Sequence, residues 1–306
     1  MGWLRSKRSG LRVPLESLHL VGRSPRSALL LTDSRVSHEH ASLRWDGGVW
    51  TLRDLGSLNR TTSNGQALAP GEVVSLPLGA RIVFGSEEEC WILEDDGPPQ
   101  VMAVPLDDGI AMVAEDGLLP LPSAENPLLT IYRAQNGTWT YEDGSASEPL
   151  TDQAIIQAGP LRYRFCLPQI TSRTTPVSGL GGLRVSNLHL EFLVSSDLEH
   201  IEILARAGEA TRKLGARSHN ELLLLLARAR RNDQEQGLPA PSCGWLSQDE
   251  VARMMRLDPE HLNVQIFRIR RQFAELGLVD PGQIVERRPK SRQMRFGGVS
   301  SSETRA

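Results

Sequence analysis

The sequence predicts a multidomain chain with an N-terminal all-β sandwich, a β-rich acidic middle segment and a C-terminal α+β domain. Its 306 residues, 40% hydrophobic and 23% charged, have a globular composition and are enough for two or three domains. Turn residues divide short apolar runs in the first half of the chain. Signals for helix starts occur only in the last third, after a stretch rich in Ser, Thr and Gly.

The small net charge of −3 hides three blocks of different charge. Residues 1–85 hold 11 basic and 6 acidic side chains, residues 86–160 hold 1 and 15, and residues 161–306 hold 22 and 16. The net charges of the blocks are therefore +5, −14 and +6. A basic block attracts phosphate and an acidic block repels it, so the two ends of the chain are the candidates for binding phosphate.

The first domain, expected at residues 1–96, consists of short apolar or alternating runs. Gly, Pro, Asn and Asp separate these runs, which is typical of strands, and Asp46-Gly47-Gly48 is a hairpin signal. None of the runs has helical periodicity, so we expect a small all-β sandwich. The strands are predicted at Leu18–Val21, Ala28–Leu31, Ser42–Trp45, Val49–Arg53, Val73–Leu76 and Arg81–Phe84.

The acidic middle segment, expected at residues 97–170, continues the β pattern, because Asp-Gly and Asn-Gly pairs divide it into short runs. Residues 42–57 and 130–145 form a weak internal repeat, which fits either a scaffold copy or an unrelated pair of hairpins. The second stretch lacks the polar motifs of the first, which favours unrelated hairpins. Residues 171–186 are rich in Ser, Thr and Gly and predict a linker.

The last domain, expected at residues 187–298, begins with strands at Leu188–Val194 and His200–Ala205 and continues with three helices. Ser218 with Glu221 and Ser247 with Glu250 are two capping boxes, and Asp258-Pro259 is a third helix start. The third helix carries one apolar stripe, with Val264 on the opposite face. A hairpin around Pro289 and a disordered tail at 299–306 complete the prediction. The stripe consists of Leu262, Ile266, Ile269, Phe273 and Leu276.

Three polar clusters lie in loops between the strands of the first domain. They are Gly22-Arg23, Ser37-His38-Glu39-His40 and the stretch from Gly56 to Gly65. In this order and spacing they resemble the forkhead-associated (FHA) domain, which reads phosphothreonine in peptides, over roughly residues 15–93. The chemistry is suitable, because a phosphate dianion requires a fixed guanidinium and several neutral donors.

The resemblance implies which residues bind and which shape the loops. Leu58 stands where many FHA domains have Thr, which removes a hydroxyl contact, and Arg60 stands where they have Gly, which adds a cation or restricts the loop. An FHA-like scaffold that binds no phosphate is the alternative. The phosphopeptide contacts implied are Arg23, Ser37, His38, Asn59 and Arg60, with Gly22, His40 and Gly65 as structural residues.

Strands, three helices and a terminal hairpin together are similar to the winged-helix output domain of bacterial response regulators, over about residues 185–298. The segment from Leu262 to Arg271 resembles the recognition helix of that family. Residues 267–296 hold 8 basic and 3 acidic side chains, which would suit DNA phosphates. Glu286 in the hairpin and Phe267, a residue that we expect to be exposed, would also suit a winged helix that binds protein. The implied DNA contacts are Val264, Arg268, Arg271, Arg287, Arg288, Lys290 and Arg292.

Other function classes lack support in the sequence. There is no Gly-rich phosphate loop with Lys, no nucleophile elbow and no His pair with metal spacing, so we expect no enzymatic activity, no cofactor, no metal and no small-molecule substrate. No run approaches the ~18 apolar residues of a membrane span, so we expect no membrane partner. Three scattered cysteines, Cys90, Cys166 and Cys243, favour a cytoplasmic location.

The leading hypothesis is a bacterial signalling regulator. Its first domain would bind a threonine-phosphorylated protein from a Ser/Thr-kinase pathway, and its winged helix would bind double-stranded DNA as a transcription regulator. The alternative is a phosphothreonine-binding adaptor whose winged helix contacts protein. A third hypothesis is capture of phosphorylated Thr171, Thr174 or Thr175 by the Arg23 pocket of the same or a neighbouring molecule. The acidic middle segment is expected to shield the basic helix and hairpin until the first domain is occupied.

Overall fold

The computed structural model describes residues 1–107, 109–134, 136–168, 183–196, 200–288 and 291–305. They form two compact units, which are described separately. Unit 1 comprises residues 1–111 and the short stretch that begins at Cys166, and unit 2 comprises 112–165 and the described residues from 183 onward. The predicted middle segment is thus divided between the units at residue 111. Thr171, Thr174, Thr175, Pro289 and Lys290 lie outside the described residues.

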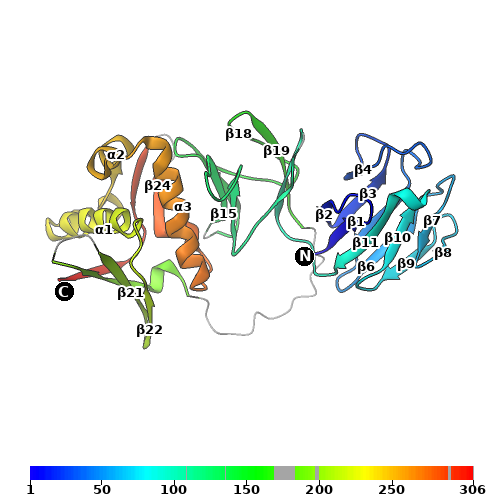
Figure 1. Ribbon diagram of the computed structural model, residues 1–306. Helices are drawn as coiled ribbons and strands as arrows, with labels where there is room; N and C mark the ends of the chain where they lie inside the picture. The colour runs from blue at the N-terminus through cyan, green and yellow to red at the C-terminus, as the bar shows by residue number, and fades with distance from the viewer. Residues whose placement is uncertain (108, 135, 169–182, 197–199, 289–290, 306) are drawn as a thin grey trace. The chain divides into compact units, whose positions relative to one another are not determined.

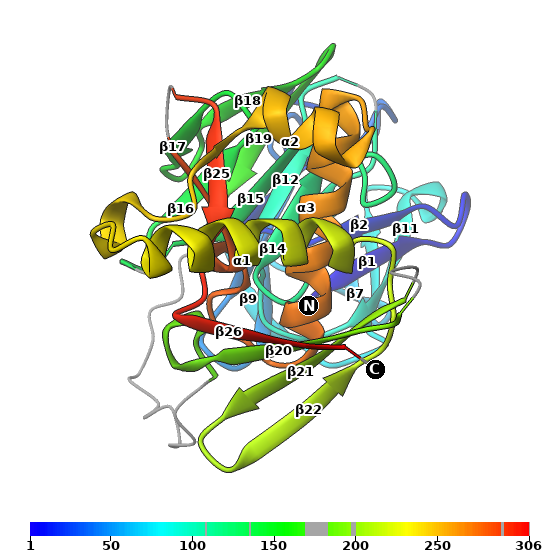
Figure 2. The same ribbon diagram turned by 90° about the vertical axis from the view of Figure 1, so that its left-hand side faces the viewer.

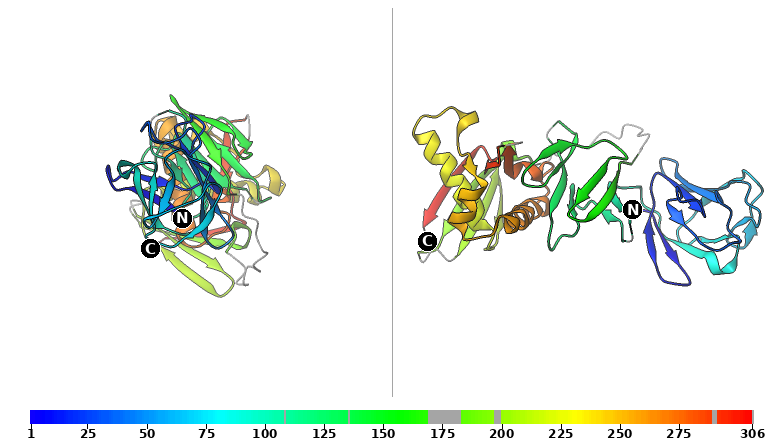
Figure 3. Two further views of the ribbon diagram at one scale, coloured as in Figure 1. Left: turned by 90° about the vertical axis from the view of Figure 1, so that its right-hand side faces the viewer. Right: turned by 90° about the horizontal axis from the view of Figure 1, so that it is seen from above.

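Unit 1 is built on a sandwich of two sheets (Figure 3). The apolar faces of both sheets meet in one core, which contains Leu43, Trp50, Leu52, Ile82 and Phe84. One sheet has the order β2-β1-β11-β10-β7-β8, with β1 Trp3–Ser6, β2 Arg12–Pro14, β7 Thr61–Ser63, β8 Gln66–Ala67, β10 Arg81–Phe84 and β11 Cys90–Asp95. The other has the order β4-β3-β5-β6-β9, with β3 Leu18–Gly22, β4 Leu29–Leu30, β5 Ala41–Trp45, β6 Trp50–Asp54 and β9 Val73–Leu76.

The sandwich prediction is confirmed, and the hairpin at Asp46-Gly47 joins β5 to β6 with Trp45 opposite Trp50. Strands β1, β2, β7, β8 and β11 of the first sheet were not predicted. β1, β2 and β11 extend this sheet, because Leu4 and Leu93 belong to the same core. The short helix η1 (Glu87–Glu89) precedes β11, and β12 (Met102–Pro105) lies near the end of the unit.

Unit 2 begins with β strands from the acidic segment. A four-stranded antiparallel sheet runs β14-β15-β16-β17, and β18 pairs with β19 in a hairpin. Thr130 lies opposite Glu142 and Tyr132 lies opposite Thr140, so Tyr132 and Glu142 share one face of the sheet. The strands are β13 Met112–Val113, β14 Leu118–Leu121, β15 Leu129–Arg133, β16 Trp139–Glu142, β17 Ser147–Pro149, β18 Ile155–Ala158 and β19 Leu161–Cys166.

The rest of unit 2 is an α+β arrangement around one apolar core. Helix α1 crosses the sheet β22-β21-β20-β26, and α3 lies beside β15 (Figures 1 and 2). A second, three-stranded sheet has the order β23-β25-β24. The elements are η2 Val185–Asn187, β20 His189–Val194, β21 Ile201–Ala207, β22 Ala210–Leu214, α1 Asn220–Glu235, η3 Ala240–Ser242, β23 Leu246–Ser247, α2 Gln248–Met255, α3 Pro259–Glu275, η4 Pro281–Ile284, β24 Val285–Arg288, β25 Gln293–Phe296 and β26 Ser300–Arg305.

The local helix signals were correct in part. The Ser247 hydroxyl accepts a hydrogen bond from the Glu250 N–H at 3.1 Å, which confirms Ser247 as the N-cap of α2. The box at Ser218 is wrong, because α1 begins at Asn220 with His219 at its N-cap. Residues 300–305, which were expected to be disordered, form β26, whose backbone pairs in parallel with β20.

Candidate functional site

Three loops of unit 1 bring together residues predicted to contact a phosphopeptide. Arg23 follows β3, Ser37 precedes β5, and Asn59 lies between β6 and β7. The Arg23 N–H donates to the Ser37 carbonyl at 3.0 Å, and the Asn59 amide Nδ2 donates to the Arg35 carbonyl at 2.8 Å. The Leu58 N–H donates to the Ser37 hydroxyl oxygen at 3.1 Å. Direct hydrogen bonds therefore link all three loops.

Gly22 allows the first two loops to approach one another. A Cβ at this position would lie 2.1 Å from the His38 carbonyl oxygen, which is a severe overlap with backbone. The adjacent Arg23 donates from Nε to the Val36 carbonyl at 2.5 Å. No acceptor among the described residues binds its Nη1 or Nη2 group, so these donors remain available for an anion.

His40 is buried and braces two of the loops. Its Nδ1 accepts from the Ser37 N–H at 3.0 Å, and its Nε2 donates to the Arg60 carbonyl at 3.2 Å. Burial lowers the pKa of His40, although the Arg60 carbonyl and Asp54 oppose this shift. The neutral ring with a proton on Nε2 satisfies both contacts, so His40 shapes the site from beneath.

Asp54 is a site residue that the sequence analysis missed. It ends β6, is fully buried, and its carboxylate accepts hydrogen bonds from the chain that carries Asn59. Oδ1 accepts from the N–H groups of Gly56 and Ser57, at 2.8 and 3.0 Å. Oδ2 accepts from the Ser57 hydroxyl at 2.6 Å and from the Thr61 N–H and hydroxyl at 3.0 and 2.7 Å. Although burial opposes the shift, these bonds lower the pKa of Asp54.

The two departures from the FHA pattern have distinct structural outcomes. Arg60 adopts φ = 64°, the left-handed region that glycine enters most readily, and its carbonyl accepts from His40 and from the Gly85 N–H. Leu58 is 86% exposed beside Ser37. His38 is also exposed, and Gly65 forms the β7–β8 turn with φ = 86°.

The DNA contacts predicted on α3 fall into two groups. Arg268 and Arg271 are exposed, and Arg271 pairs with Glu275 at 3.2 Å. Val264 is only 6% exposed. Phe267 is 4% exposed, so the prediction that it is exposed was wrong: it packs against Leu118 and Tyr132 of the acidic segment.

The described cations of the predicted hairpin, Arg287, Arg288 and Arg292, have partners within unit 2. Arg287 is buried beside Glu142, with Nε 3.4 Å from the carboxylate. Arg288 stacks on Trp245 at 4.0 Å, and Arg292 pairs with Asp249 at 3.3 Å. Of the cations predicted to contact DNA, only Arg268 lacks a partner among the residues that the structure describes.

Within the described ranges, no three His, Cys, Asp or Glu side chains are grouped so that they could hold a metal ion. No helix in these ranges has the length and apolar character required to cross a membrane.

Comparison with known sequences identifies the first domain. The FHA domain family matches residues 19–85, so this part of the chain is an FHA domain, as its loop motifs predicted. FhaA of Mycobacterium tuberculosis, an FHA domain-containing protein, is 39% identical over 66 residues, which are 20% of this chain and 12% of FhaA. FhaB of the same organism is 36% identical over 78 residues, 25% of this chain and 49% of FhaB. The chain thus spans half or less of these relatives.

Solved structures also match this part of the chain. A crystal structure of the FhaA FHA domain complexed with the intracellular domain of Rv3910 is 32% identical and has a TM-score of 0.27. The match covers 30% of this chain and 98% of that chain. A structure described as an analysis of phosphothreonine-dependent FHA domain interactions is 31% identical, with a TM-score of 0.27, and covers 30% and 92%.

Proposed function

We propose that this chain is a phosphothreonine-dependent signalling protein whose FHA domain binds a threonine-phosphorylated protein. The observation that carries the proposal is the convergence of Arg23, Ser37 and Asn59 on three hydrogen-bonded loops. Buried Asp54 and His40 hold these loops, so the donors are positioned before a ligand arrives. Such preorganisation reduces the entropy lost on binding.

Each of the three residues has a donor suited to a phosphopeptide. A phosphothreonine carries about −1.5 to −2 charges near neutral pH and three acceptor oxygens. Arg23 offers its two Nη groups, and Ser37 offers its hydroxyl proton, because its oxygen already accepts from the Leu58 N–H. Asn59 uses one amide hydrogen for Arg35 and retains its Oδ1 and second hydrogen for the peptide backbone.

The test is titration of the full chain with matched phosphothreonine and unphosphorylated peptide libraries. We expect binding only to the phosphorylated peptides and a loss of at least about tenfold for Arg23→Ala, since each 1.4 kcal/mol is a factor of ten. Arg26→Ala in the same loop is the matched control and should bind like the wild type. Equal binding of both peptide libraries, or an unaffected Arg23→Ala variant, would refute the proposal.

A second candidate function for unit 2 is DNA binding as a winged-helix transcription regulator. The order of sheet, three helices and hairpin supports it, as does the exposed Arg268 of α3. The test is binding of the full chain to duplex DNA over a range of salt concentrations. Affinity that falls with salt and is weakened by Arg268→Ala would support DNA binding, and no binding at low salt would refute it.

The adaptor alternative is favoured by the burial of Val264 and Phe267, because a covered helix face is not free to enter a groove. Recovery of a protein partner through unit 2 without DNA would support it.

We further propose that the chain acts in the cytoplasm as a binding protein and not as an enzyme. The three cysteines are all buried and form no disulfide among the described residues, which is compatible with a reducing compartment.

A further inference from the structure

Residues 112–165, here called the cover, pack on the outer face of α3. Leu118 and Tyr132 of the cover contact Phe267 and Ala274 of α3 in one apolar cluster. A Cβ at Gly282 would lie 2.2 Å from the Tyr132 ring, so the chain after α3 also approaches the cover closely. The side of α3 that carries Phe267 and Ala274 is thus an internal interface of unit 2, whereas Arg268 and Arg271 of the face assigned to DNA stay exposed.

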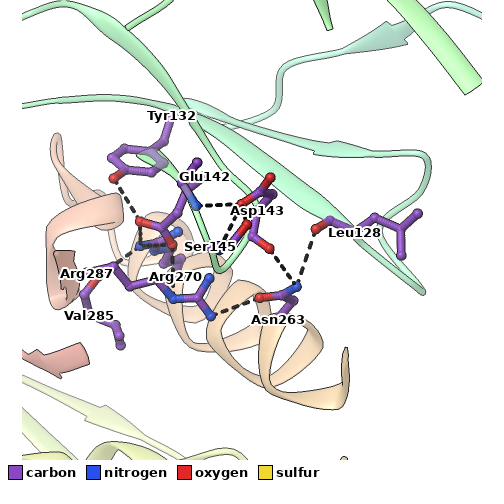
Figure 4. A network of polar contacts seen from close by, with 10 residues as sticks. Leu128, Tyr132, Glu142, Asp143, Ser145, Asn263, Arg270, Val285 and Arg287 are labelled. Carbon is purple, nitrogen blue, oxygen red and sulfur yellow. Dashed lines mark hydrogen bonds and ion pairs between the residues drawn. The ribbon is translucent and has the colours of Figure 1, made fainter. Parts of the chain in front are cut away.

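A buried ion cluster lies in the middle of this interface (Figure 4). The Glu142 carboxylate of the cover lies 3.0 Å from Nη2 of Arg270 on α3 and 3.4 Å from Nε of Arg287 on β24. The Tyr132 hydroxyl donates to the same carboxylate at 3.1 Å. The side chains of Glu142, Arg270 and Arg287 are 2%, 1% and 6% exposed.

The cluster contains two cations for one carboxylate. Burial alone would raise the pKa of Glu142, but Arg270 and Arg287 outweigh burial and lower it. Burial lowers the pKa of Arg287 and the neighbouring Arg270 lowers it further, although Glu142 and Asp143 oppose the shift. The Nε group of Arg270 is buried and has no hydrogen-bond acceptor among the described residues. The two guanidinium groups therefore have unused capacity for an anion.

The remaining contacts fix the geometry of the two arginines. Arg270 Nη2 also donates to the Val285 carbonyl at 2.8 Å, and Arg287 Nη2 donates to Asn263 Oδ1 at 2.9 Å. The two arginines and these two acceptors belong to α3 and β24, whereas Glu142 and Tyr132 come from the cover. Removal of the cover would leave a preformed pair of cations on α3 and β24.

We propose that Arg270 and Arg287 form an anion-binding site for the backbone phosphates of duplex DNA, and that Glu142 occupies this site as an internal competitor. A phosphodiester and a carboxylate each carry one negative charge shared by two oxygens, and guanidinium groups bind both in the same fork geometry. This inference rests on the proposed DNA-binding function. When the cover separates from α3, the site adds its two cations to those of exposed Arg268 and Arg271 on the same helix.

The test compares three forms of the full chain: wild type, Glu142→Gln, and the matched control Glu148→Gln at an exposed position of β17. The probes are tripolyphosphate and a short DNA duplex of mixed sequence at low salt. Hydrogen exchange of α3 reports whether the cover opens, and exchange of β20 and β21 reports whether the rest of unit 2 stays folded. Adding Arg270→Met to Glu142→Gln tests whether any gain depends on the arginine.

We expect Glu142→Gln to expose α3 and to bind both probes at least about tenfold more tightly, a difference of 1.4 kcal/mol. Arg270→Met should remove this gain, and Glu148→Gln should behave like the wild type. If Glu142→Gln binds neither probe more tightly than the wild type does, the anion site is refuted, even if the wild type binds DNA through Arg268. A gain in affinity for tripolyphosphate but not for DNA would refute DNA as the ligand of this site, and the absence of DNA binding by every form would refute the DNA-binding function.

Glu142→Asp is the second variant, because it keeps the negative charge but its side chain is one methylene shorter, which moves the carboxylate away from the two arginines. It should open α3 less than Glu142→Gln and gain less affinity. Loss of β20 and β21 protection in both variants would show that Glu142 is required for folding of unit 2 and would refute its role as a competitor.

Discussion

Replacement of Asp54 by Asn should loosen the loop that carries Asn59 while leaving the sandwich intact. The amide oxygen of Asn can replace Oδ1, but its NH2 group would then face the Thr61 N–H, which is a donor facing a donor. The hydroxyls of Ser57 and Thr61 can rotate to accept, whereas the buried backbone N–H cannot. One unsatisfied buried group costs about 1–3 kcal/mol, and the loss of charge weakens the other hydrogen bonds. We therefore expect the free energy of unfolding to fall by about 2–4 kcal/mol in total.

The assay is urea unfolding of the full chain, together with hydrogen exchange at Gly56, Ser57 and Thr61. Phosphopeptide affinity should fall with Asp54→Asn because the loop is no longer held. Since the pKa of Asp54 is lowered below its usual 3.8, its contribution to stability is present above that value and is lost as the pH falls below it. Asp54→Asn should therefore also reduce the acid sensitivity of unit 1.

Asp46→Asn is the matched control, because Asp46 is exposed in the β5–β6 turn. It should unfold and bind peptide like the wild type. Unchanged exchange at the three amides in Asp54→Asn, with an unchanged unfolding midpoint, would show that the carboxylate does not hold the loop.

Three further predictions concern single positions. Gly22→Ala places a Cβ 2.1 Å from the His38 carbonyl and should lower the free energy of unfolding by at least about 1–3 kcal/mol and reduce phosphopeptide affinity. Gly48→Ala, which has open space around the new Cβ, should do neither. Equal melting temperatures of the two variants would contradict this prediction. Because the folded pKa of His40 is lowered from 6.5, the unfolding free energy of unit 1 should decrease as the pH falls below 6.5, and His40→Gln should flatten that slope in a urea series. Ser247→Ala should lower the stability of unit 2 by about 1 kcal/mol in thermal unfolding, and no change would mean that the cap is dispensable.

The FHA domain could be predicted because its signals are local. Turn residues separate the strands, and the loop motifs stand in a fixed order, so the fold follows from short stretches of sequence, and the same stretches contain the candidate binding residues. Asp54 could have been found from its position at the end of a strand, followed by Gly56, Ser57 and Thr61. An Asp that precedes several small polar residues is typical of a side chain that caps backbone N–H groups.

The interface between the cover and α3 could not be predicted from the sequence. Helical periodicity located the stripe from Leu262 to Phe273 correctly, but we predicted that the opposite face, with Val264, Arg268 and Arg271, contacts DNA. Phe267 and Arg270 lie on a second buried face because α3 is covered on two sides, and periodicity within one helix cannot identify a second partner. Glu142 was one of many acidic residues in a charged segment, and nothing nearby in sequence marks it as buried.

The parallel pairing of β20 with β26 affects how unit 2 folds. His189 pairs with Ser300, and in the same unit Glu142 pairs with Arg270. Both contacts join positions more than a hundred residues apart, and such long loops must close before their contacts can form. We expect unit 2 to fold slowly, with α3 formed early as local structure. During that interval its apolar and cationic outer face is open to chaperones and to other chains.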